Sequence, residues 1–111
     1  MSDTLSPDTL TRLEATIAAR RLADPSSSYV AKLNARGVPK IAQKVGEEAV
    51  EAVIAAMADD REGLVGEAAD LLFHLMVLLA AKDVPLDEVL AELDRREGVS
   101  GIAEKASRKA D

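Results

Sequence analysis

The chain contains no cysteine and no tryptophan, and its 111 residues include one tyrosine, one phenylalanine and one histidine. Without cysteine it can form no disulfide, no thiolate metal site and no cysteine nucleophile, which agrees with a reducing compartment. A metal site would therefore have to use oxygen ligands. Alternation of β-branched or aromatic residues is also absent, so the pattern indicates an all-α protein.

Charge and hydropathy exclude further classes of protein. The formal net charge of −6 argues against a nucleic-acid-binding surface, because duplex binding depends on Lys and Arg neutralising phosphates. A small phosphorylated ligand could still bind through bridging cations. The longest apolar stretch, residues 68–81, is interrupted by Asp70 and His74, so no membrane span is expected. The N-terminus has no basic segment followed by an apolar one, so we expect a cytoplasmic protein.

Helical spacing and capping residues indicate a single domain, residues 1–111, with about four to five helices. Ser6 and Pro7 are expected to begin the first helix, which ends near residues 24–25. The other expected helices are residues 29–34, 39–58, 61–82 and one that begins at Pro85. Residues 102–109 could add a short helix. A helical bundle is the natural architecture for these elements.

The helix expected over residues 61–82 is apolar on almost every side. Between residues 67 and 81 its only polar side chains are Glu67, Asp70 and His74, which form a single stripe. Such a helix must be surrounded by other helices, and a chain of this size can hardly surround it alone. We therefore predict a homodimer or a higher homo-oligomer.

Two acidic motifs indicate a divalent metal site. Glu48-x-x-Glu51 and Glu67-x-x-Asp70 each place two carboxylates on one helix face. The first motif by itself also fits a solvated face on which Lys44 pairs with Glu48. The second motif fits such a face poorly, since Asp70 lies among apolar neighbours and burial without a partner would be costly. Hard oxygen ligands favour Mg²⁺, with Mn²⁺ as a second candidate.

Iron is the alternative metal, because carboxylate bundles also hold di-iron sites. Those sites typically use two Glu-x-x-His pairs, whereas this chain has one histidine. We interpret His74 as a core residue that hydrogen-bonds a carboxylate rather than as a metal ligand.

Four segments carry a resemblance to a known family: SYVAKL at residues 28–33, KIAQKVGEEAVE at 40–51, EAADLLFH at 67–74 and GIAEKASR at 101–108. Together they resemble phosphoribosyl-ATP pyrophosphatases, a family of the all-α MazG-like nucleotide pyrophosphatases. The resemblance implies a MazG-like bundle and Mg²⁺-dependent hydrolysis of phosphoribosyl-ATP to phosphoribosyl-AMP and pyrophosphate, the second step of histidine biosynthesis.

The resemblance also implies roles for individual residues. Glu48, Glu51, Glu67 and Asp70 would hold metal ions that bridge the triphosphate. Glu47 is the candidate for an extra ligand or for the general base, although it could equally point outward. The candidates for binding substrate are basic: Lys32, Lys40, Lys44, Lys105 and Arg108.

Two other functions stay open. One is a housecleaning pyrophosphatase of the same superfamily that acts on non-standard nucleoside triphosphates. The other is a non-catalytic helical dimerisation module. The QKVGEE run at residues 43–48 and the EKASR run at residues 104–108 favour the phosphoribosyl-ATP enzyme over both.

Overall fold

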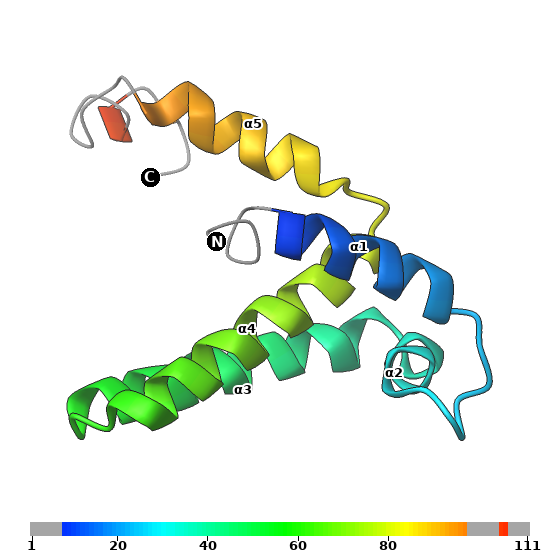
Figure 1. Ribbon diagram of the computed structural model, residues 1–111, viewed down its shortest axis with the longest axis horizontal. Helices are drawn as coiled ribbons and strands as arrows, with labels where there is room; N and C mark the ends of the chain where they lie inside the picture. The colour runs from blue at the N-terminus through cyan, green and yellow to red at the C-terminus, as the bar shows by residue number, and fades with distance from the viewer. Residues whose placement is uncertain (1–7, 98–104, 107–111) are drawn as a thin grey trace.

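The computed structural model describes residues 8–97 and 105–106. This part of the chain forms five helices and no strand: α1 (Asp8–Arg20), α2 (Tyr29–Arg36), α3 (Val38–Met57), α4 (Arg61–Ala81) and α5 (Leu86–Glu97). The predicted all-α fold is confirmed. Helices α3 and α4 lie side by side as a long antiparallel pair, with α1 packed near the C-terminal end of α4 (Figure 1).

Local sequence sets the ends of α2 and the start of α3. Ser28 is the N-cap of α2, where its hydroxyl accepts a hydrogen bond from the Ala31 N–H at 3.1 Å. Gly37 ends α2 with a φ of 92°, a left-handed conformation that favours glycine. Pro39 lies in the first turn of α3, where no intrahelical N–H is needed. The chain therefore turns from α2 into α3 with a single residue between them.

The core lies where the ends of the helices meet. It consists of aliphatic and methionine side chains from all five helices: Ile17, Val30, Leu33, Ile41, Met76, Val77 and Leu86. Ile17 on α1 and Ile41 on α3 are each only 1% exposed. This cluster fixes how α3 sits against α4, and so decides which of their polar side chains meet.

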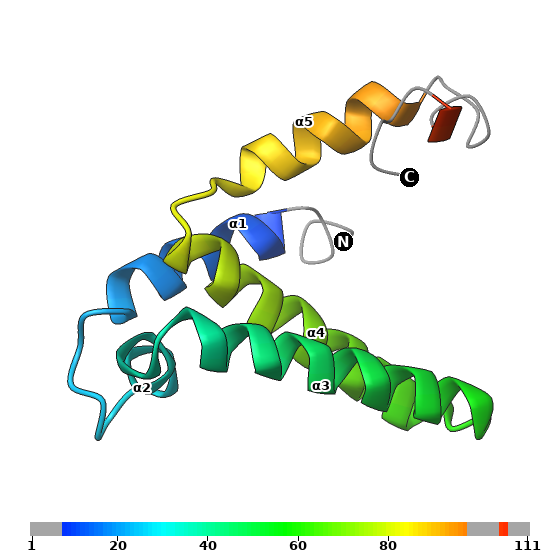
Figure 2. The ribbon, with the colours of Figure 1, turned by 180° about the vertical axis from the view of Figure 1, so that it is seen from behind.

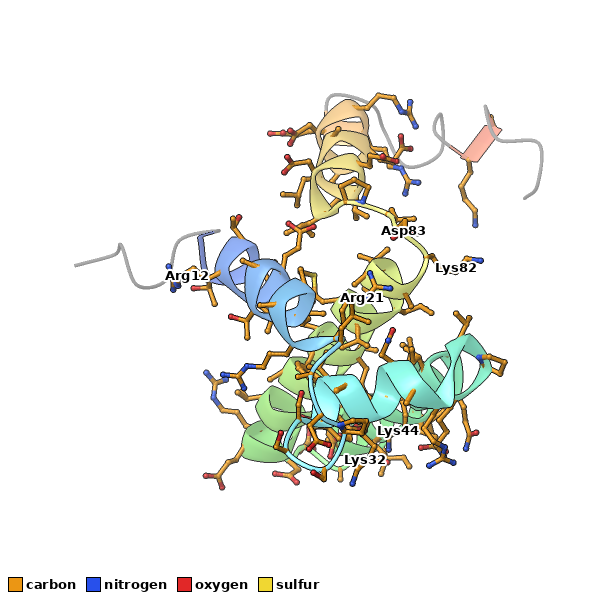
Figure 3. All side chains as sticks on the ribbon, turned by 90° about the vertical axis from the view of Figure 1, so that its right-hand side faces the viewer. Arg12, Arg21, Lys32, Lys44, Lys82 and Asp83 are labelled. Atoms are coloured by element: carbon orange, nitrogen blue, oxygen red, sulfur yellow. The ribbon has the colours of Figure 1, made fainter. Side chains whose placement is uncertain are left out.

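Two side chains of the α1 region hold the junction of α4 with α5. Glu14 accepts a hydrogen bond from the Leu86 N–H, at the start of α5, at 2.8 Å. Arg21 donates to the Ala80 carbonyl oxygen at 3.2 Å and lies 3.8 Å from the Asp83 carboxylate. Figure 3 shows Arg21 close to Asp83, which lies in the loop that forms this junction.

The outer half of the α3–α4 pair extends away from α1 and α2 (Figure 2). On it α3 exposes Val50, Val53, Ile54 and Met57, which follow helical spacing and have exposed fractions between 58% and 80%. We call these four residues the apolar stripe of α3. Leu64 and Val65 on α4 are also exposed. An uncovered stripe of this kind is typical of a helix that packs against a partner.

The predicted helix ends are correct to within two residues except at the first helix. The prediction that this helix reaches residues 24–25 is wrong, because α1 ends at Arg20. The Asp24 carboxylate instead accepts a hydrogen bond from the Ser26 N–H at 2.9 Å, a local turn that competes with helix. The predicted start at Ser6 and Pro7 lies outside the described residues, as does the predicted tail helix apart from residues 105–106.

Candidate metal centre

The two acidic motifs meet where α3 packs against α4. Glu48 of α3 and Glu67 and Asp70 of α4 each place one carboxylate oxygen within 4.8 Å of the others. Glu48 is buried, Glu67 is half-buried and Asp70 is exposed. The cluster is therefore closed at Glu48 and open to solvent at Asp70.

This burial order corrects the sequence interpretation. The sequence assigned the solvated role to the first motif and the buried role to Asp70, but the buried carboxylate is Glu48, which is 7% exposed. The reason is that α3 turns Glu48 onto α4, whereas no described helix covers the edge of α4 that carries Asp70. An apolar neighbourhood in the sequence does not bury a side chain unless another element covers it.

Two oxygens of the cluster, Glu48 Oε1 and Glu67 Oε1, are buried without a hydrogen-bond partner among the described residues. The pKa of Glu67 is raised to about 7, first by a hydrogen bond with Glu48 and then by burial and by the nearby Glu51. Such a hydrogen bond forms only when one of the two carboxyl groups is protonated. Crowded and unpartnered carboxylate oxygens fit a hard divalent cation such as Mg²⁺, which would take the place of the shared proton.

Glu51 borders the cluster. It lies on α3, one turn after Glu48, and is exposed. Its side chain is close enough to Glu67 to raise the pKa of that carboxyl. Glu51, Ile54 and Glu67 also line a shared surface pocket. The pocket places Glu51 beside the cluster on the side of the apolar stripe of α3.

Glu47 does not join the cluster. Its carboxylate accepts a hydrogen bond from the Gln43 side chain at 2.7 Å and lies 3.3 Å from Lys44 Nζ. These two contacts hold the pKa of Glu47 below its usual range. Glu47 is therefore an ionised carboxylate beside the site rather than a member of the group formed by Glu48, Glu67 and Asp70.

Lys44 is the base that the structure joins most closely to the cluster. Its Nζ lies 3.7 Å from Glu48 Oε2, which confirms the pair predicted from the sequence. A hydrogen bond with Glu47 is the main cause of the raised pKa of Lys44. Lys40, one turn earlier on α3, is near enough to contribute to the lowered pKa of Glu47.

The other predicted bases are more remote. Lys32 is exposed on α2, and Figure 3 shows it with Lys44 on the side of the molecule formed by α2 and α3. The segment 105–106, which includes Lys105, lies beyond the far end of α5 and away from α3 and α4 (Figures 1 and 2). Arg108 is outside the described residues. The roles of Lys105 and Arg108 stay predictions.

His74 is a core residue whose two ring nitrogens are both engaged. Nδ1 is 2.8 Å from the backbone oxygen of Asp70, and Nε2 is 2.9 Å from the hydroxyl of Tyr29. The expectation that His74 bonds a carboxylate is wrong, because its partner at Asp70 is the backbone carbonyl. With both nitrogens engaged, the histidine that a di-iron site would need is not directed at the acidic cluster.

Comparison with known proteins agrees with this geometry. Residues 10–97 match the family described as phosphoribosyl-ATP pyrophosphohydrolase. The chain belongs to this family. Three relatives carry the name phosphoribosyl-ATP pyrophosphatase. The protein of Novosphingobium aromaticivorans is 80% identical over 99 residues, which cover 89% of this chain and 92% of the relative. The protein of Rhizorhabdus wittichii is 76% identical over 100 residues, which cover 90% of this chain and 94% of the relative. The protein of Erythrobacter litoralis is 71% identical over 101 residues, which cover 91% of this chain and 97% of the relative.

The phosphoribosyl-ATP pyrophosphohydrolase match includes the whole of α2, α3 and α4, and with them the acidic cluster. Sequence reasoning did not predict that Tyr29 contacts His74. Tyr29 and His74 are separated by 45 positions, and no local pattern indicates that they meet. Their contact follows from the packing of α2 against α4.

Proposed function

We propose that this protein is a Mg²⁺-dependent hydrolase that converts phosphoribosyl-ATP into phosphoribosyl-AMP and pyrophosphate, the second step of histidine biosynthesis. The single observation that supports this most strongly is the pair of buried, unpartnered oxygens on Glu48 and Glu67 beside Asp70. A cation site of this kind is what a triphosphate substrate requires, and the chain belongs to a family whose named members act on phosphoribosyl-ATP.

The proposed metal ligands are Glu48, Glu67 and Asp70, with Glu51 as the fourth carboxylate. Glu51 would complete the set from the exposed side, because it already lies close to Glu67. Bound Mg²⁺, or Mn²⁺ in its place, would supply the positive charge that neutralises the phosphates and the charge that develops on the leaving pyrophosphate. The exposed position of Asp70 leaves that side of the cluster accessible to a nucleotide from solvent.

Glu47 is the proposed acceptor for the proton of the attacking water. Its carboxylate stays ionised at neutral pH, because Gln43 and Lys44 lower its pKa. An ionised carboxylate can orient a water molecule through its free lone pairs. The same low pKa makes Glu47 a weak base, so we expect it to contribute mainly by orientation.

The proposed phosphate-binding side chains are Lys32, Lys40 and Lys44, joined by Lys105 and Arg108 from the tail. Lys44 is already ion-paired with Glu47 and Glu48, so a bound phosphate would share it with these acids. Lys32 lies on the neighbouring helix α2, and Lys40 lies on α3 one turn before Lys44. Both would bind the phosphates as flexible point charges.

We also propose that a second copy of the chain covers the apolar stripe of α3. Helix α4 is long and apolar enough to cross a membrane by length and composition, but it carries Glu67, Asp70 and His74 along its middle, which lipid would disfavour. Packing against another copy would cover the apolar stripe of α3, while the carboxylates would stay available to bind the metal. Because Ile54 of the stripe shares a pocket with Glu51 and Glu67, the second copy would border the site. We also propose that the enzyme is cytoplasmic.

The decisive test is release of pyrophosphate with Mg²⁺ present, comparing phosphoribosyl-ATP with ATP and dUTP. We expect turnover of phosphoribosyl-ATP to exceed that of the other two and to stop in EDTA. Equal rates on all three would replace this proposal with a housecleaning enzyme, and no turnover at all would favour a dimerisation module.

A further inference from the structure

Tyr29 is joined to the backbone of Asp70 through His74. The Tyr29 hydroxyl lies 2.9 Å from His74 Nε2, and His74 Nδ1 lies 2.8 Å from the backbone oxygen of Asp70. A carbonyl oxygen can only accept a hydrogen bond, so Nδ1 must carry a proton. In the neutral ring Nε2 is then the acceptor, and the Tyr29 hydroxyl must donate its proton to it.

This arrangement decides what the Tyr29 hydroxyl can offer to a ligand. Its one proton is directed inward to a histidine that is 5% exposed, whereas the residue itself is 47% exposed. The lone pairs of its oxygen are not used by this hydrogen bond. Tyr29 can therefore offer a ligand a hydrogen-bond acceptor and has no proton free for a phosphate oxygen.

The ring is also held in place. Tyr29 is stacked on Phe73, with ring centroids 6.0 Å apart and planes 22° apart, and its ring meets His74 at 85°. It is the first residue of α2, directly after the N-cap Ser28. An exposed side chain that is fixed by these two ring contacts and by the hydrogen bond to His74 is preorganised to meet a ligand.

Tyr29 lies close to Lys44, one of the proposed phosphate-binding lysines. It is near enough to Lys44 to raise the pKa of that amine, and Lys44 is 3.7 Å from Glu48. Through His74 it is linked to Asp70, one helical turn away. Tyr29 is therefore near a side chain that would hold the phosphates of a substrate.

From this geometry we infer that Tyr29 is a specificity-determining residue that accepts a hydrogen bond from a sugar hydroxyl of the nucleotide, with His74 as its positioning residue. The inference rests on the proposed function for the identity of the substrate. The ribose is the group bonded directly to the phosphate chain, and its hydroxyls are donors, whereas the phosphate oxygens are acceptors that would repel the Tyr29 oxygen.

The test compares Tyr29→Phe with the unchanged protein on phosphoribosyl-ATP and on its counterparts lacking the 2′- or the 3′-hydroxyl of the ATP-derived ribose, all with Mg²⁺. The unchanged protein should prefer the full substrate over one of the deoxy compounds by about 3- to 10-fold in kcat/KM, the value of one hydrogen bond. Tyr29→Phe should remove that preference, and the loss should fall on KM rather than on kcat. His74→Leu, which frees the tyrosine proton, should weaken the preference as well.

Phe73→Leu is the matched control, because it loosens the ring stack but keeps the hydroxyl and its histidine. It should retain the preference for the hydroxylated sugar. If Tyr29→Phe does not fold, the chain offers a second route, since Tyr29 is its only tyrosine. Protein made with 3,5-difluorotyrosine and assayed at mildly acidic pH, where the fluorinated phenol keeps its proton, then carries a poorer acceptor at this one site and should show the same loss of preference.

An unchanged preference in both Tyr29→Phe and the fluorinated protein would overturn the inference, as would equal use of the full and deoxy substrates by the unchanged protein. Failure of the proposed function is distinguishable from both results, because it would appear as absent turnover of phosphoribosyl-ATP by the unchanged protein.

Discussion

Glu67 on α4 faces Glu48 on α3, and a hydrogen bond between their carboxyl groups, with burial and the nearby Glu51, raises the pKa of Glu67 to about 7. A carboxyl with a raised pKa binds its proton more tightly in the folded protein than in the unfolded chain, where the pKa is near 4.5. Because a metal ligand must give up its proton, this pair links folding, protonation and metal binding.

The first prediction concerns the pH dependence of stability without metal. As the pH rises from 4.5 to about 7, the folded protein loses the proton that stabilises it relative to the unfolded chain, so the Glu67 contribution to the free energy of unfolding should fall. Mg²⁺ should counteract this fall, since it binds the ionised cluster. Urea midpoints in EDTA and in Mg²⁺ over this pH range measure both effects.

Glu67→Gln is the control for this prediction, because it keeps the shape of the side chain and removes its titration. The difference in stability between the unchanged protein and Glu67→Gln in EDTA should vary with pH in the stated direction. A difference that stays constant from pH 4.5 to about 7 would refute the raised pKa.

The second prediction concerns Asp70→Asn. Asp70 is exposed and the change is nearly isosteric, so helicity and the urea midpoint should stay close to those of the unchanged protein. Mg²⁺-dependent turnover should fall by more than about 100-fold, because the loss of a ligand exceeds the loss typical of residues behind the ligands. Asp94→Asn, at another exposed position on α5, should leave turnover intact. Near-normal turnover by Asp70→Asn would defeat the metal-site proposal.

The third prediction concerns the contact between Glu14 and Leu86. The Glu14 carboxylate satisfies the Leu86 N–H, which begins α5 and has no partner within its own helix. Glu14→Ala should lower the free energy of unfolding by about 1 to 2 kcal/mol, measured from urea curves with an unchanged slope. Glu14→Gln keeps an acceptor oxygen and should lose less. Equal losses in the two variants would show that the acceptor is not the stabilising feature.

The fourth prediction concerns the apolar stripe of α3. Val53→Lys changes a residue that is 61% exposed in the single chain, so the variant should fold, but the lysine should disfavour burial against a second copy. Sedimentation at micromolar concentration should show an oligomer for the unchanged protein and a smaller species for the variant. Leu93→Lys on α5, at 56% exposure, should not alter the oligomeric state. If the unchanged protein sediments as a monomer, the proposal that a second copy covers the apolar stripe is wrong.

Much of the fold follows from short-range patterns. Ser28, Gly37 and Pro39 define the turn from α2 to α3 through capping and backbone conformation, which depend on a few neighbouring residues. The Lys44 and Glu48 pair follows from positions four apart on one helix. The first helix ends at Arg20 rather than near residues 24–25, where the Asp24 side chain forms a local turn with Ser26 instead of a last helical turn.

Some features of the site likewise follow from short-range patterns, and others follow from tertiary packing. Two pairs of carboxylates lie on helix faces because the helical period places residues three apart together, and this is readable from the residue order. The burial of Glu48 and the contact of Tyr29 with His74 follow instead from how the helices pack against one another. Those outcomes depend on the rotation of α3 against α4 and on the docking of α2, which the shared core around Ile41 fixes and no local periodicity contains.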